Sequence, residues 1–165
     1  MARVIHIDLT PSGIDRAISE LKRFESDLKK ALDDLMVALK DEGVAEAKMH
    51  ILAFMAVDTG ELLGSITGVY DPQTRIAIIR ANADYAAFVE YGTGVVGQGS
   101  PHPAPVLLWK YDIHGHGDAG WEYVSPRDGK LHWTQGQPSR PFMYRTVERL
   151  RDKAPEMAER ILSRL

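Results

Sequence analysis

The longest regular pattern of apolar positions lies in the first third of the chain. Its members are spaced by three, four or seven residues: Ile14, Ile18, Leu21, Leu28, Leu32, Leu35 and Leu39. This spacing places them on one side of an α-helix, which Thr10–Ser12 can start. Gly43 is expected to interrupt the helix, and a second helical segment is expected over Val44–Met55. We interpret the stripe as core packing; a coiled-coil dimer is the alternative, which Glu25 disfavours by interrupting the seam.

A β-hairpin is predicted in the next part of the chain. Two runs of β-forming residues, Ser65–Tyr70 and Arg75–Ala81, flank the sequence Asp71–Thr74. Pro72 suits the second position of a turn between them. A further strand is predicted from the partial alternation of apolar residues over Ala2–Leu9.

Short helices are predicted on both sides of this hairpin. Before it, Asp58 and Glu61 have the spacing of a capping box, which opens a helix that includes Leu62 and Leu63. After it, a helix is predicted over Tyr85–Tyr91. Asn82 or Asp84 can cap this second helix, and Gly92 can end it in the left-handed conformation: this is the usual chemistry of helix ends.

The C-terminal part of the chain is predicted to be helical. Pro141 can occupy the first turn of a helix that runs to about Lys153, and Pro155 can start a second segment that ends at Leu165. Together these elements predict an α+β fold in a single domain, residues 1–165. Its small antiparallel sheet packs against the long N-terminal helix, with a C-terminal helix and an inserted hairpin loop.

The segment Gly94–Pro138 differs in composition from the rest of the chain. It holds eight of the 14 glycines, five of the 9 prolines, all 3 tryptophans and four of the 6 histidines. Trp121–Val124 and Leu131–Thr134 predict a second hairpin, and the remainder is expected to be loop. Loops longer than about 12 to 15 residues are usually functional or disordered. We therefore interpret it as a docking element that is ordered mainly when a partner is present, with three candidate anchors: Trp109, Trp121 and Trp133.

Composition argues against several classes of function. The 20 basic and 23 acidic side chains give a formal net charge of −3, without the basic excess typical of proteins that grip nucleic acid. The absence of cysteine excludes disulfide scaffolds and thiolate metal sites. No apolar run approaches the roughly 20 residues that cross a bilayer, and Met1–Thr10 lacks the apolar stretch of a signal peptide. We expect a protein of the cytoplasm, without a cofactor and without a membrane partner.

Two motifs suggest a metal-dependent or aspartic hydrolase, and each has a simpler interpretation. Asp58-Thr59-Gly60 matches the catalytic triplet of aspartic proteases, but the chain has one copy and the capping pattern explains Asp58. A histidine-rich stretch invites a metal site, but its glycines fix no geometry, so a solvated loop is the favoured interpretation. Its possible ligands are Asp112, His114, His116 and Asp118, with His102 and His132 nearby. We expect no enzyme activity.

Three segments carry a resemblance to a known family. They are Val57–Ile66 after the long helix, Tyr85–Thr93 after the hairpin, and Ser139–Tyr144 at the start of the C-terminal helix. In this order they resemble the tail-completion (head–tail joining) proteins of the neck of long-tailed bacteriophages. The resemblance covers most of the chain outside the insertion and the first ten or so residues. The chain departs from the family in the length of the segment between Thr93 and Ser139, which leaves its neighbours in the neck open.

The resemblance implies a structural virion protein that forms a homo-oligomeric ring, typically hexameric, through which DNA passes without specific binding. Its neighbours would be head-closure or portal-adaptor proteins and tail-terminator or tail-tube proteins; a tail-terminator ring that caps the tail tube is the alternative. For Glu90 and Arg140, a solvated face and a structural ion pair or subunit contact are both open. The resemblance implies structural or interface roles for Asp58, Thr59, Gly60, Tyr85, Glu90, Tyr91, Gly92, Arg140, Pro141 and Phe142.

Overall fold

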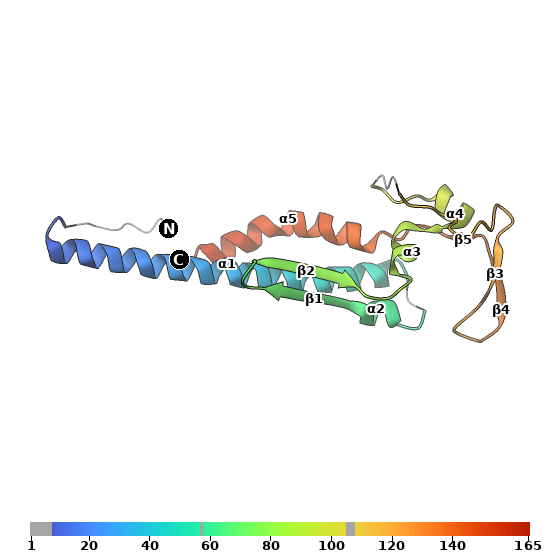
Figure 1. Cartoon of the computed structure of the whole chain (residues 1–165), viewed down its shortest axis with the longest axis horizontal. Coiled ribbons are helices and arrows are strands. Elements are labelled where there is room, and N and C mark those ends of the chain that lie inside the picture. The colour runs from blue at the N-terminus through green and yellow to red at the C-terminus, as the bar shows by residue number, and fades with distance from the viewer. Residues whose placement is uncertain (1–7, 57, 105–107) are drawn as a thin grey trace.

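The computed structural model of the chain describes residues 8–56, 58–104 and 108–165. It confirms the predicted α+β architecture (Figure 1): α1 (Pro11–Ala53) runs along the molecule, and both a two-stranded antiparallel sheet and the C-terminal helix α5 (Phe142–Leu162) lie along it. Nearly all of the strand predicted over Ala2–Leu9 lies outside the described residues. No helix in the described ranges has an apolar stretch long enough to cross a membrane.

Helix α1 is continuous, so the predicted break at Gly43 is wrong. Gly43 is buried, and a Cβ atom there would lie 2.1 Å from Cδ1 of Ile79 and 3.0 Å from Cδ1 of Leu150. The glycine therefore gives space for side chains of the sheet and of α5, and it does not end the helix. At the start of α1, Thr10 is the N-cap, and its hydroxyl accepts a hydrogen bond from the N–H of Gly13 at 3.2 Å.

The apolar stripe of α1 serves the core only in part. Its first members, Ile14, Ile18 and Leu21, are exposed, because the N-terminal part of α1 extends past the end of α5 (Figure 1). The members from Leu28 to Leu39 are partly buried. Core packing therefore explains the stripe only where α5 and the sheet cover α1.

The predicted first hairpin is confirmed. Strand β1 (Ile66–Asp71) pairs antiparallel with β2 (Ile76–Ala81), and Val69 lies opposite Ile78. In the turn, the carboxylate of Asp71 accepts hydrogen bonds from the N–H of Gln73 at 2.9 Å and from the hydroxyl of Thr74 at 2.8 Å. One face of the hairpin packs on α1.

Both short helices are confirmed, but their predicted caps are wrong. Helix α2 (Glu61–Ser65) begins after Gly60, whose φ is 84°, and the N–H of Glu61 donates to the hydroxyl of Thr59 at 3.3 Å. The side chain of Asp58 turns instead to Arg127. The capping-box prediction fails because a distant partner competes for the carboxylate.

Helix α3 (Ala86–Tyr91) has no side-chain cap at its start. The side-chain amide of Asn82 donates to the carbonyl of Ser65 at 2.7 Å, so it braces the hairpin instead of capping the helix. Gly92 ends α3 with a positive φ of 82°, as predicted, but its ψ of 167° is extended and not left-handed helical. The chain therefore leaves α3 in an extended direction toward the insertion.

Helix α5 is one helix, and the predicted break at Pro155 is wrong. Proline removes one backbone N–H donor, which costs an interior helix hydrogen bond. Packing of α5 along α1 on both sides of Pro155 outweighs that loss: Lys153 before it pairs with Glu42 and Glu46 of α1.

The insertion has more regular structure than predicted. The second hairpin is confirmed as β3 (Trp121–Val124) paired with β4 (Leu131–Thr134), and it stands at one end of the molecule beyond α2 (Figure 1). Two elements were expected to be loop: helix α4 (Gly94–Gly99) and the short strand β5 (Gly136–Gln137). The glycine content of α4 hid its helical character from a propensity argument.

The hydrophobic core lies where α1, α2, α3 and α5 meet. Its buried members come from all three segments that resemble the neck family as well as from α1. They are Ala47, Ile51, Leu62, Ile66, Ala83, Ala86, Val89 and Phe142.

Candidate functional site

The three family-like segments are joined by hydrogen bonds at one place, which we call the α3–α5 junction. The N–H of Leu62 in α2 donates to the hydroxyl of Tyr85 at 3.0 Å. The N–H of Arg140 donates to the carbonyl of Val89 at 2.8 Å, and the hydroxyl of Ser139 donates to the carbonyl of Glu90 at 2.6 Å. Segments that are far apart in the sequence therefore form one structural unit.

Glu90 is the central side chain of this junction. It is 6% exposed, and its carboxylate accepts hydrogen bonds from the N–H groups of Met143 at 2.8 Å and Tyr144 at 2.9 Å. These groups belong to the first turn of α5, where backbone donors have no acceptor within the helix, and Pro141 provides no side-chain cap. A negative charge also suits the positive end of the helix dipole. Of the two interpretations of Glu90, the solvated face is wrong, and the structural contact is made within the chain.

His102 completes the surroundings of Glu90. Its Nε2 lies 3.1 Å from Oε1 of Glu90, and both side chains are buried. The imidazole packs between the rings of Tyr91 and Tyr144, with ring centroids 4.8 Å and 5.2 Å away. Nδ1 lies 3.1 Å from both the N and the O of Ala104. His102 therefore connects the start of the insertion to the α3–α5 junction. Its position in the sequence, between two prolines, did not predict this role.

Arg140 does not pair with Glu90 in the described contacts. Its guanidinium donates to Oε1 of Gln137 at 3.0 Å, and this bond braces the chain between β5 and α5. The segment Ser139–Tyr144 therefore contacts the rest of the fold through the backbone N–H of Arg140 and the buried ring of Phe142, and not through a salt bridge of Arg140 with Glu90.

The three candidate anchors differ in their surroundings. The ring of Trp109 packs against Phe88 and Tyr91, and its indole N–H donates to the carbonyl of Gly92 at 3.0 Å. Trp121 is partly buried and stacks on His116, with 4.6 Å between the ring centroids. Trp133 is 59% exposed. The side chain of Trp109 therefore makes its contacts within its own chain. Of the three candidate anchors, Trp133 is the one best placed to contact a partner.

The Asp58-Thr59-Gly60 triplet lies at the surface. Oδ1 of Asp58 is 2.5 Å from Nη2 and 2.8 Å from Nε of Arg127, which lies in the turn between β3 and β4. An aspartic protease needs a second carboxylate that shares a proton with the first. Within one chain the partner of Asp58 is instead a guanidinium, so the pair connects the second hairpin to the loop before α2.

The possible metal ligands form only a partial cluster: Nδ1 of His116 lies 3.1 Å from Oδ1 of Asp112, and the ring centroids of His114 and His116 are 5.6 Å apart. Hydrogen bonds from the N–H groups of His116 and Gly117 lower the pKa of Asp112 to about 2, and the ring of His116 adds a further bond. His102 is engaged by Glu90, and His132 pairs with Asp128. Within the described residues, no three side chains of the ligating types are placed to hold a metal ion.

An ion cluster connects α1 to α5. Glu46 is 3% exposed, and Nζ of Lys153 lies 2.5 Å from its Oε1, while Nε of Arg149 lies 3.7 Å away. Burial acts to raise the pKa of Glu46, but the hydrogen bond and charge of Lys153, with His50 and Arg149, bring the pKa below its ordinary value. The cluster is a clamp between the two long helices.

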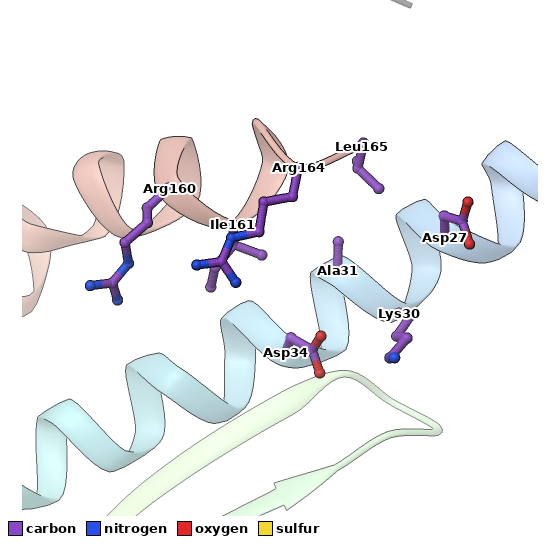
Figure 2. A pocket seen from close by; sticks show the side chains of 8 residues that line it. All are labelled: Asp27, Lys30, Ala31, Asp34, Arg160, Ile161, Arg164 and Leu165. Atoms are coloured by element: carbon purple, nitrogen blue, oxygen red, sulfur yellow. The ribbon is translucent and has the colours of Figure 1, made fainter.

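An open groove of about 580 Å³ lies between α1 and the end of α5 (Figure 2). Asp27 and Asp34 stand on the α1 wall, and Arg160 and Arg164 on the α5 wall. No salt bridge joins these four described side chains. The remaining lining residues of this open groove are Lys30, Ala31, Ile161 and Leu165.

Compared with protein-family models, curated proteins and solved structures, the chain has no significant match. The resemblance to neck proteins therefore depends on the three segments themselves. In the structure these segments are joined by hydrogen bonds at the α3–α5 junction, and both hairpins expose apolar side chains.

Proposed function

We propose that this chain is a structural subunit of the neck of a long-tailed bacteriophage, where it forms a ring that completes the tail and joins it to the head. DNA would pass through the ring without specific binding. The observation that carries the proposal is that all three family-like segments are hydrogen-bonded into one unit: Leu62 to Tyr85 at the start of α3, and the carboxylate of Glu90 to the first turn of α5 at its end.

The residue types in these segments are the ones that the junction requires. Tyr85 supplies the hydroxyl for the N–H of Leu62, Glu90 supplies the acceptor for the first turn of α5, and Phe142 fills the core. Each segment alone is a weak pattern. Because residues of all three segments contact one another in one structural unit, we interpret them together as one family pattern.

The surface supports an assembly role over a catalytic one. Large apolar side chains are exposed on the start of α1 and on both hairpins. Exposed apolar patches usually mark surfaces that other proteins cover. The formal charge of −3 also suits a channel wall that must not bind phosphate tightly.

The test is genetic. A nonsense codon early in the gene for this chain, in the phage that carries it, is expected to yield DNA-filled heads and complete tails that remain separate. Supplying the intact chain from a plasmid should restore joined particles, whereas supplying it with the same nonsense codon should not. Tails of abnormal length would indicate the tail-terminator role instead, and joined, infectious particles without the chain would contradict the proposal.

A further inference from the structure

The outer face of the β1–β2 hairpin is apolar and uncovered. Val69 and Ile78 form a cross-strand pair on this face, and Ile76 lies beside them; Val69 is 59% exposed. Arg80 lies two residues from Ile78 on the same face and is exposed. The opposite face packs on α1, where a Cβ on Gly68 would lie 2.8 Å from side-chain atoms of Lys40 and Val44.

The β3–β4 hairpin has a face with the same layout. Val124 and Leu131 form a cross-strand pair, and Glu122 lies two residues from Val124, opposite Trp133. Leu131 is 67% exposed, and Val124 and Trp133 are exposed to a similar extent. Each hairpin therefore presents an aliphatic pair with a charged residue beside it. The β1–β2 face also carries Asp71 at its turn end, where Gln73 and Thr74 hydrogen-bond the carboxylate.

The charged residues beside the two aliphatic pairs have opposite signs. Arg80 is basic and Glu122 is acidic, and neither has an ion-pair partner in the described part of the chain. Each hairpin is a separate two-stranded sheet. The β1–β2 hairpin already packs on α1, whereas an isolated two-stranded hairpin such as β3–β4 is marginally stable in water until another layer covers it. Stacking one face on the other would bury both aliphatic pairs and bring Arg80 and Glu122 together.

The two faces of one chain lie apart. The β1–β2 hairpin runs beside α1, whereas β3–β4 stands beyond α2 at the end of the molecule (Figure 1). The second hairpin is held there by the Arg127–Asp58 ion pair and by the bridges of β5 to Thr93 and Gly94. A contact between the faces therefore needs two copies.

We propose that the β3–β4 face of one copy packs on the β1–β2 face of the next, and that this head-to-tail contact builds the ring; the inference rests on the proposed function. A contact between two different faces propagates from copy to copy and closes when the rotation permits. Two small sheets bury little area, so a single contact is weak and closure of the ring strengthens it.

The natural absence of cysteine provides the test. Ile78→Cys and Leu131→Cys each introduce a unique thiol, and the two purified variants are mixed at high concentration under mild oxidation. A covalent dimer is expected in the mixture and not with either variant alone. Glu159→Cys, at an exposed position of α5, is the control partner. A mixed dimer no stronger than this control, or equal dimers from each variant alone, would overturn the contact.

Charge reversal sharpens the result. Arg80→Glu in the Ile78→Cys chain, or Glu122→Arg in the Leu131→Cys chain, should lower the dimer yield about tenfold, and combining the two should restore it. Dimer yields that are unchanged by either charge reversal would contradict the proposed contact. The genetic test examines the neck function separately. If the nonsense mutant yields separate heads and tails but the cysteine variants form no mixed dimer, the proposed contact is wrong and the neck function is still supported.

Discussion

The carboxylate of Glu90 in α3 accepts a hydrogen bond from the backbone N–H of Tyr144 at 2.9 Å, across 54 positions of sequence. A second bond, from the N–H of Met143, makes Glu90 the cap of a helix to which it does not belong. The start of α5 is therefore fixed by α3, and the surroundings of Glu90 also hold the insertion through His102.

Replacing Glu90 should loosen α5 at its first turn. Glu90→Ala leaves two backbone donors and His102 without their acceptor, so we expect a loss of about 2–4 kcal/mol in the free energy of unfolding, measured with denaturant. Glu90→Gln retains one acceptor oxygen and should lose less. Exposed Glu159→Gln is the control, and a Glu90→Ala protein as stable as this control would contradict the capping role.

Gly92 should not tolerate a side chain. Its φ of 82° and ψ of 167° lie in a region that only glycine adopts readily, and a Cβ would lie 2.7 Å from N of Ser139 and 2.9 Å from O of Gln137. Gly92→Ala should cost about 2–4 kcal/mol, since backbone atoms cannot move aside. Gly64→Ala, where a Cβ meets open space, is the matched control. Equal thermal unfolding of the two variants would refute this.

The clamp between α1 and α5 should weaken in acid. The pKa of Glu46 is lower in the folded chain than its ordinary value, so as the pH falls the unfolded chain takes up this proton first. The stabilisation is present above about pH 4.3 and is lost as the pH falls through the folded pKa. Denaturation from pH 6 to pH 3 should therefore show a steeper loss for the natural chain than for Glu46→Gln. Parallel profiles would count against the clamp.

The tryptophans should separate into structural and assembly roles. Trp109→Ala should cost about 2–3 kcal/mol, because the partly buried ring packs on Phe88 and Tyr91 and its N–H is bonded. Trp133→Ala should change the free energy of unfolding by less than about 1 kcal/mol, since the ring is exposed. Iodide should quench Trp133 more strongly than Trp109. Similar losses of stability for both variants would remove the distinction.

We expect no hydrolytic activity. Asp58 is paired with Arg127, His102 with Glu90 and His132 with Asp128, while His114 and His116 contact each other in the glycine-rich stretch. Assays with peptide and phosphodiester substrates, with and without added Zn²⁺, should show no turnover. Turnover that disappears in Asp58→Ala or His114→Ala protein would establish the hydrolase alternative.

The elements that local patterns determine could be predicted from the sequence. The 3.6-residue spacing in α1, the alternation in both hairpins and the turn at Asp71 require no knowledge of distant residues. The predicted breaks at Gly43 and Pro155 failed because the usual effects of these residues are local, whereas packing of the sheet and α5 decided both positions.

The interior of the site could not be predicted in the same way. Glu90 and His102 are 12 positions apart, and Glu90 and Met143 are 53 apart, so no spacing rule links them. Trp109 has the residue type of an interface anchor and equally that of a core side chain, and only its contacts with Phe88 and Tyr91 separate the two. The three family-like segments can be recognised from their residue patterns, but the contacts that explain those residues form only in the folded chain.

The most direct test of the proposed neck function is a cryo-electron microscopy reconstruction of the neck of purified particles of a phage that encodes this chain. It should contain a closed ring of copies of this fold between the head portal and the tail tube, in which the 43-residue helix α1 and the β3–β4 hairpin can be traced. A complete neck in which no density fits this chain, from particles whose mass spectra contain none of its peptides, would contradict the assignment.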